Sequence, residues 1–259
     1  MPLLKIGGAL LLPLALSTLY LSFRFPQSTE TLYAQGLYPE VVRLFAAMNR
    51  GYFSWAEVLL LVGSVAIALF FRPRRLLLTI WWAAGVAVWA FLVLWGFNYA
   101  RPSLEERLAL VPPAADPEML LEAGERTASE TAALYSKLEQ SSRPTRLPVS
   151  FEELDRLIDE GYRELKLPGD RIDGSTMPAK PLMSSTLFSY LGISGIFIPF
   201  TGEPSVNALQ PDAALPLVLA HEKAHQRGIT HEGEANFAAF LVCSRESAPP
   251  YLRYAAYLF

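Results

Sequence analysis

Apolar residues gather in the first part of this 259-residue chain, before about residue 98, and are not spread evenly along it. Three runs contain few charges, at about 6–23, 52–71 and 76–97. Each run is near the roughly 20 residues with which a helix crosses the apolar core of a bilayer. The pattern therefore predicts a membrane domain over residues 1–98, with one transmembrane helix in each run.

Flanking charges predict how these helices are oriented. The short loop Arg72-Pro73-Arg74-Arg75 carries three arginines between two apolar runs, which favours the cytoplasmic side of a membrane. The third helix then runs outward, so the region after Phe97 is expected outside the cytoplasm. Lys5 before the first run also fits a cleavable signal peptide, but no small-x-small cleavage site precedes Phe25. We therefore expect an uncleaved helix.

The remainder, residues 99–259, has the alternation of polar and apolar positions that is typical of a soluble domain. A helix is predicted over about 116–140, which opens on Asp-Pro, and a second over about 150–165, which opens on a Ser-x-x-Glu capping box. Strand-forming residues within 180–198 predict a small sheet. The predicted fold class is α+β: N-terminal transmembrane helices followed by a mainly helical domain with a small β-sheet.

Composition agrees with a membrane protein, because 52% of the residues are hydrophobic. The formal net charge of -3 and a pI near 5.7 give no support to a nucleic-acid partner, and no basic patch or phosphate-binding glycine loop is present. A single cysteine, Cys243, excludes an intrachain disulfide. The expected partners are a lipid bilayer and a substrate, and the oligomeric state stays open.

All three histidines of the chain lie within eleven residues, in the sequence HEKAHQRGITH from His221 to His231. This sequence contains HExxH, which on a helix puts His221 and His225 on one face, four residues apart. Two imidazoles so placed can bind one Zn²⁺, and Glu222 beside them can act as the general base for an attacking water. A chance HExxH with core histidines is the alternative. The absence of histidine elsewhere favours a zinc site.

Three residues compete to be the third metal ligand. The full pattern HExxHxxGxxH also matches the metzincins, in which His231 would complete the site, but no methionine follows Met183 to form their methionine turn. The sequence Glu232-Gly-Glu-Ala-Asn236 is similar to the glutamate helix of gluzincin peptidases. There Glu232 would bind the metal while Asn236 supports a ligand histidine. Glu234 lies about 200° around the same helix from Glu232. We rank Glu232 first, His231 second and Glu234 third.

Four segments together resemble a domain-of-unknown-function family of bacterial multi-pass membrane proteins with zincin-like motifs. They are the HEKAHQRG and EGEANF sequences, the segment 195–203 (GIFIPFTGE) and the segment 95–102 (WGFNYARP). The resemblance covers most of the chain from Trp95 onward. It implies a zincin-like domain anchored in a bacterial cell membrane, and an edge strand near Ile196–Ile198 beside the metal helix that can pair with an extended substrate. The alternative for this strand is an ordinary core strand.

The expected function is that of a membrane-anchored zinc metallopeptidase that hydrolyses peptides or proteins, with His221, His225 and Glu232 as metal ligands and Glu222 as catalytic base. A non-catalytic membrane sensor or assembly factor with a structural zinc is the alternative. The intact Glu222 argues against it, because a closed structural zinc site needs no general base. A transporter is a third possibility, for which three spans leave little room.

Overall fold

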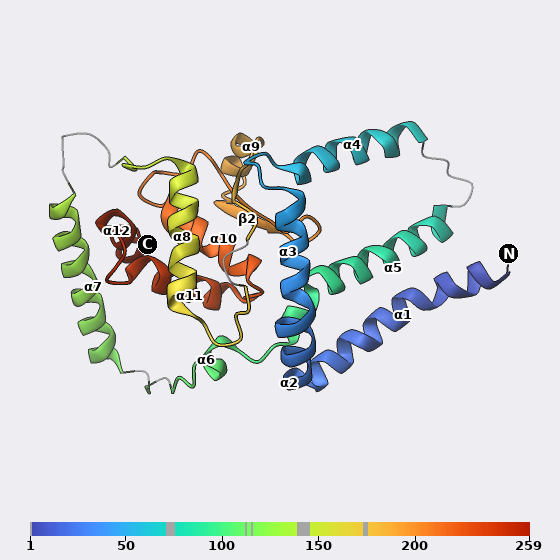
Figure 1. Ribbon diagram of the computed structural model, residues 1–259, viewed down its shortest axis with the longest axis horizontal. Coiled ribbons are helices and arrows are strands. Elements are labelled where there is room, and N and C mark those ends of the chain that lie inside the picture. The colour runs from blue at the N-terminus through green and yellow to red at the C-terminus, as the bar shows by residue number, and fades with distance from the viewer. Residues whose placement is uncertain (1, 71–75, 112, 115, 139–145, 173–175) are drawn as a thin grey trace.

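The computed structural model describes the whole chain except residues 1, 71–75, 112, 115, 139–145 and 173–175, and it describes no side chains for 2–9, 68–70 and 76–79. The described part is mostly helical with one three-stranded sheet (Figure 1). The Arg72–Arg75 loop, on which the predicted orientation depends, lies outside the described residues.

The N-terminal part forms three long helices that extend side by side from the rest of the molecule, and a shorter group that stands across their base (Figure 1). The long helices are α1 (Pro2–Arg24), α4 (Trp55–Phe70) and α5 (Leu76–Leu94). The shorter group consists of α2 (Pro26–Thr29), the π-helix η1 (Glu30–Leu37) and α3 (Tyr38–Met48). Helices α1 and α5 pack together, and the Trp89 indole donates to the Leu11 carbonyl across this contact at 2.9 Å.

The prediction of transmembrane helices over 6–23, 52–71 and 76–97 is contradicted. Within the residues that the structure describes, no helix is both long enough and apolar enough to span a membrane. Helix α4, with 16 residues, is shorter than the roughly 20 residues that a bilayer core requires. The expected helices are present, but not as spans.

The rest of the chain surrounds one small sheet with helices. Strands β1 (Lys180–Pro181), β3 (Glu203–Val206) and β2 (Gly195–Ile198) follow in the order β1-β3-β2, with β1 parallel and β2 antiparallel to β3. The helices are η3 (Gly96–Ala100), α6 (Leu104–Arg107), α7 (Pro117–Lys137), α8 (Phe151–Leu165), α9 (Ser185–Tyr190), α10 (Leu215–Gln226), α11 (Glu232–Ser244) and α12 (Pro250–Leu258). The expected mainly helical region with a small sheet is confirmed.

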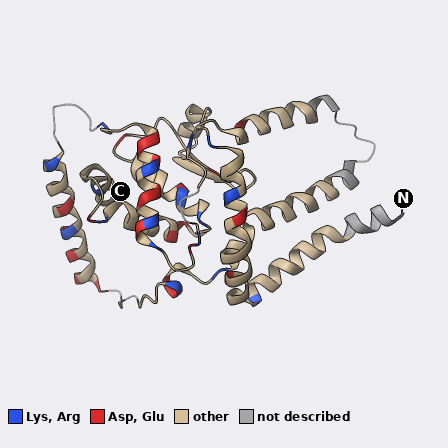
Figure 2. Ribbon diagram, viewed as in Figure 1, with Lys and Arg blue, Asp and Glu red and all other residues tan. Residues whose placement is uncertain are grey.

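Capping explains where two of the predicted helices begin. Asp116 accepts a hydrogen bond from the Glu118 amide at 3.0 Å, and Ser150 accepts one from the Glu153 amide at 3.2 Å. Helix α8 carries many acidic and basic residues (Figure 2), and it buries Leu154 and Ile158 completely. Arg156, Arg163 and Glu164 are exposed, as expected for an amphipathic helix, whereas Asp155 is buried.

Small residues let α10 and α11 approach closely. The core between them is rich in alanine, with Ala220, Ala224, Ala235, Ala238 and Ala239 all fully buried. Short side chains at a helix contact bring the two backbones together. Side chains of α10 and α11 at the edge of this helix contact can therefore reach one another.

Two buried or half-buried carboxylates join α4 to the sheet side of the molecule. Glu203, at the start of β3, accepts hydrogen bonds from the Ser54 hydroxyl at 2.8 Å and from the Trp55 and Ala56 amides at 3.0 and 3.2 Å. Glu57, on α4, accepts from the Ser184 amide at 2.9 Å, just before α9. These carboxylates occupy helix N-termini, where backbone N–H groups lack partners within the helix.

Candidate metal centre

Helix α10 carries the HExxH sequence, and its ends are defined locally. Pro216 occupies the first turn, where a missing N–H costs nothing. At the other end Gly228 has φ +76, and the amides of Gly228 and Ile229 return to the carbonyls of His225 and Ala224 at 2.9 and 3.1 Å. This left-handed turn is the glycine C-cap that the sequence predicts. It directs the chain into α11, which begins at Glu232.

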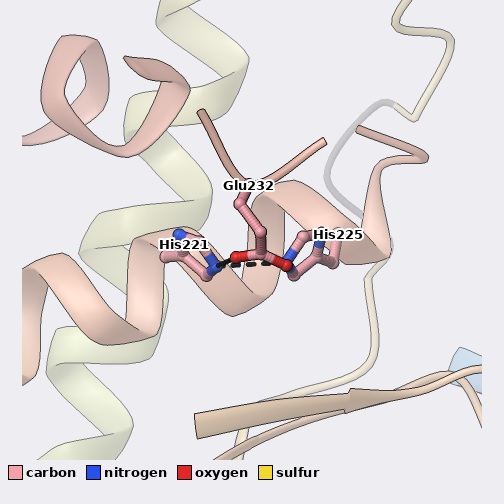
Figure 3. Close-up of side chains that lie close together, drawn as sticks. All are labelled: His221, His225 and Glu232. Carbon is pink, nitrogen blue, oxygen red and sulfur yellow. Dashed lines mark hydrogen bonds and ion pairs between the residues drawn. The ribbon is translucent and has the colours of Figure 1, made fainter. Parts of the chain in front are cut away.

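The turn brings Glu232 back over the two histidines of α10 (Figure 3). The Nε2 atoms of His221 and His225 are 3.0 Å apart. One Glu232 carboxylate oxygen lies 3.1 Å from Nε2 of His221 and the other lies 3.4 Å from Nε2 of His225. Within the described residues, these three form a group of side chains that can hold a metal ion, with ligand atoms within 4.8 Å of one another.

The spacing of these atoms fits a zinc ion. Nitrogen and oxygen ligands bind zinc at about 2.0–2.2 Å, so two ligands of a tetrahedral site lie roughly 3.3 Å apart. The Nε2–Nε2 distance of 3.0 Å and the two Nε2–carboxylate distances of 3.1 and 3.4 Å are close to that value. Two neutral imidazoles and one carboxylate are also a ligand set that catalytic zinc uses, and it leaves a position open for water or substrate.

Each histidine is oriented through its other ring nitrogen. Nδ1 of His221 donates to Oδ1 of Asn236 at 2.8 Å, and Nδ1 of His225 donates to the Ile229 carbonyl at 2.7 Å. Because both acceptors are carbonyl oxygens, Nδ1 carries the proton in both rings and Nε2 keeps its lone pair. Such partners fix the tautomer that a metal requires. Asn236 thus occupies the supporting position expected for it.

The two competing ligands lie elsewhere. The His231 ring makes an edge contact with Tyr99, with centroids 6.1 Å apart, and its side chain is exposed at the N-terminus of α11. Glu234 accepts a hydrogen bond from the Leu104 amide at 2.9 Å and so caps α6. The structure therefore groups Glu232 with the two histidines, and leaves His231 and Glu234 outside the group.

Glu222 lies beside the histidines, buried with 5% of its surface exposed. Its Oε2 is buried without a hydrogen-bond partner in the described structure, and its Oε1 lies against Gly195 of β2, where a Cβ would come within 2.5 Å. Burial, and secondarily repulsion by Glu232, raise the pKa of Glu222 from 4.5 to about 8 in this metal-free site. A carboxyl group with an unpaired buried oxygen and a raised pKa has the properties of a proton acceptor that operates near neutral pH.

A cleft of about 520 Å³ opens over this group, between α10 and β2. Polar and apolar groups share its walls, and apart from Glu222 and the three grouped side chains the walls carry no charged residue. The other lining residues are Trp95, Tyr99, Ser194, Gly195, Ile196, Phe197, Leu217, Val218, Thr230 and Asn236. Sequence reasoning included Trp95 and Tyr99 in the segment 95–102 that carries the family resemblance, and gave neither residue a role at the site. Nothing in their local sequence shows that they reach a site some 130 residues away.

Strand β2 forms the rim of the cleft with one edge unpaired within the described sheet. The Asn207 amide donates to the Ser194 carbonyl at 2.8 Å, and Phe197 lies opposite Pro204, which has no N–H. In an antiparallel ladder the inward and outward residues alternate. Gly195 and Phe197 therefore direct their backbone N–H and C=O groups away from β3, toward the open edge.

The opposite face of α10 is buried against α8. The Lys223 ammonium is fully buried and lies 2.8 Å from carboxylate oxygens of both Asp155 and Asp159. Arg227 pairs with Asp170 at 2.9 Å and with Asp159 at 3.4 Å. Burial alone would raise the pKa of Asp159, but Lys223 and Arg227 hold it below its usual value. These ion pairs join α10, which carries His221 and His225, to the core.

Comparison with known proteins identifies a family. Residues 33–259 match the model of the family described as "Protein of unknown function (DUF3810)". The chain belongs to this family. The match begins ahead of Trp95, so it includes most of η1 and all of α3 as well as the metal centre. No curated protein and no solved structure matches the chain. The expected membership of a domain-of-unknown-function family is confirmed.

Proposed function

We propose that this protein is a zinc-dependent peptidase. One observation carries the proposal: His221, His225 and Glu232 meet at zinc-ligand spacing directly beside the buried carboxyl of Glu222. A site with three protein ligands and an adjacent general base is typical of a hydrolytic zinc centre, whereas a structural site is closed by four ligands. Bound zinc would supply Lewis acidity and an activated water at the floor of the cleft.

The residues of the chain then have distinct tasks. His221, His225 and Glu232 hold the ion, and Glu222 accepts a proton from the water that attacks the scissile carbonyl and passes a proton to the leaving amine. A cation held at the three ligands favours the carboxylate form of Glu222, against the burial that raises its pKa. Asn236 and the Ile229 carbonyl keep both imidazoles in the metal-binding tautomer.

The substrate is an extended peptide with apolar side chains near the scissile bond. The outward N–H and C=O groups of Gly195 and Phe197 can pair with such a peptide as an added strand. Leu217, Val218 and Phe197 present apolar surface to its side chains, and no Lys or Arg side chain lines the cleft to bind an acidic one.

The experiment that tests this function separates metal binding from chemistry. Zinc content and hydrolysis of unfolded casein and of a mixture of apolar decapeptides are measured for the wild type, for Glu222→Gln and for Glu246→Gln, an exposed control. We expect Glu222→Gln to keep stoichiometric zinc and to lose at least about 10²-fold in rate. Glu246→Gln should behave as the wild type. Zinc-loaded wild type that cleaves neither substrate would overturn the proposal in favour of a non-catalytic zinc protein.

A further inference from the structure

The last turn of α10 is held by side chains from a distant part of the chain. The final carbonyls of a helix have no partner inside it. Here the Trp95 indole donates to the His225 carbonyl at 2.9 Å, and the Tyr38 hydroxyl donates to the Gln226 carbonyl at 2.8 Å. Arg101 donates to the carbonyls of Arg227 and Gly228 at 3.4 and 3.3 Å. Four consecutive carbonyls are thus satisfied by three side chains.

These three donors are themselves fixed. Trp95 and Tyr38 are almost completely buried, with 6% and 2% of their surfaces exposed. Arg101 forms a buried ion pair with Glu30, with nitrogen-to-oxygen distances of 2.7 and 3.0 Å. Burial by itself would raise the pKa of Glu30, but Arg101 holds it below its usual value. Donors held this tightly define the position of the carbonyls that they bind.

The same turn orients a metal ligand. The ring of His225 is fixed by the Ile229 carbonyl, which follows Gly228 directly. Gly228 leaves no space for a side chain, because a Cβ there would come within 2.7 Å of the Asn98 amide oxygen. The Trp95 ring also meets the His225 ring edge-on, with centroids 6.2 Å apart. A shift of this turn would therefore move both the backbone of His225 and the acceptor of its ring.

We propose that Tyr38 and Trp95, supported by Arg101, are positioning residues of the metal site: by holding the carbonyls of the last turn of α10 they set the orientation of His225. The inference rests on the proposed metal site at His221, His225 and Glu232. It assigns a role in metal binding to Tyr38 of α3, to Trp95 between α5 and η3, and to Arg101 directly after η3, none of which is a metal ligand.

Substitutions that remove one hydrogen-bond donor, each with a matched control, test the role. Trp95→Phe and Tyr38→Phe remove one donor each and keep an aromatic ring. Trp89→Phe and Tyr33→Phe make the same changes where the donors bind the Leu11 and Val93 carbonyls, at 2.9 and 3.0 Å, which lie outside α10. Zinc affinity is measured by competition with a chromophoric chelator, and the absorption spectrum of bound Co²⁺ reports ligand geometry. Circular dichroism verifies that each variant is folded.

Residues that orient metal ligands typically contribute 10- to 100-fold in affinity. We expect each of Trp95→Phe and Tyr38→Phe to weaken zinc binding by about 10-fold and to alter the Co²⁺ spectrum, and the two controls to change neither. Folded Trp95→Phe and Tyr38→Phe with wild-type affinity and spectrum would overturn the inference. A wild type that binds no metal would overturn the proposed function, and this inference with it. If Trp95→Phe does not fold, Tyr38→Phe decides the outcome.

Discussion

Two faces of helix α10 both carry polar side chains and differ in their surroundings. One face directs His221 and His225 into the cleft, where the Glu232 carboxylate lies 3.1 and 3.4 Å from their Nε2 atoms. The other face buries Lys223 and Arg227 among three aspartates. The cleft face keeps donor atoms unpaired for a ligand, whereas the core face pairs its charges within the protein.

This contrast shows how one helix can be both reactive and rigid. A metal ligand needs free lone pairs, which cost stability when they are buried without a partner. The ion pairs on the opposite face join α10 to α8, so the ligands are presented from a helix that is fixed on its other side. The two faces should therefore respond differently to substitution: the core face in stability and the cleft face in metal affinity.

The largest effect is expected on the core face. Lys223→Met removes the cation between Asp155 and Asp159 and leaves two buried carboxylates without it. Breaking a buried ion pair in this way typically costs 3–5 kcal/mol. Urea unfolding should show a loss of about this size, whereas Lys137→Met, at an exposed position on α7, should change stability by less than about 0.5 kcal/mol. A loss below about 1 kcal/mol for Lys223→Met would show that the pairs do not fix the helix.

A second effect comes from Glu222 in the metal-free protein. Its folded-state pKa of about 8 lies above the unfolded value of 4.5, so the folded state favours the neutral acid. Stability should therefore fall as pH rises through this window, by about 3 kcal/mol between pH 5 and pH 8. Unfolding measured in EDTA should show this fall in the wild type and not in Glu222→Gln. Parallel pH profiles of the two proteins would contradict the prediction.

The identity of the third ligand gives the next effect. Glu232→Ala should reduce zinc affinity by more than about 100-fold, the upper end of what supporting residues contribute. His231→Ala and Glu234→Ala should change it by less than about threefold, because neither side chain reaches the group. Chelator competition on the three variants measures the difference. If Glu232→Ala keeps its zinc affinity and His231→Ala loses it, the ligands are instead His221, His225 and His231.

The smallest effect is expected for Asn236, which contacts a ligand but does not bind the metal. Asn236→Ala removes the acceptor of Nδ1 of His221 and should weaken zinc binding by about 10-fold. Asn236→Asp keeps an acceptor and should restore most of the affinity. The same competition titration checks both, and equal losses in the two variants would mean that the hydrogen bond is not what matters at this position.

Local patterns predicted much of the fold after residue 100. The capping residues Asp116 and Ser150 begin their helices, and Gly228 ends α10, since each needs only its near neighbours. Hydrophobicity alone was misleading in the first 98 residues, where apolar runs predicted spans that the described helices do not form. An apolar run shows that a segment avoids water, and does not by itself show what covers it.

For the site, the sequence by itself determined that His221, Glu222 and His225 share one helix and that a turn follows at Gly228, because helix periodicity and glycine geometry are local. Only the tertiary structure decided that Glu232 and not His231 meets the histidines, that Lys223 is a core residue, and that Trp95 and Tyr38 hold the end of the helix. The reason is physical: these choices depend on how α11, α8 and the N-terminal segment pack against α10, and contacts between distant segments leave no periodic signal in the sequence.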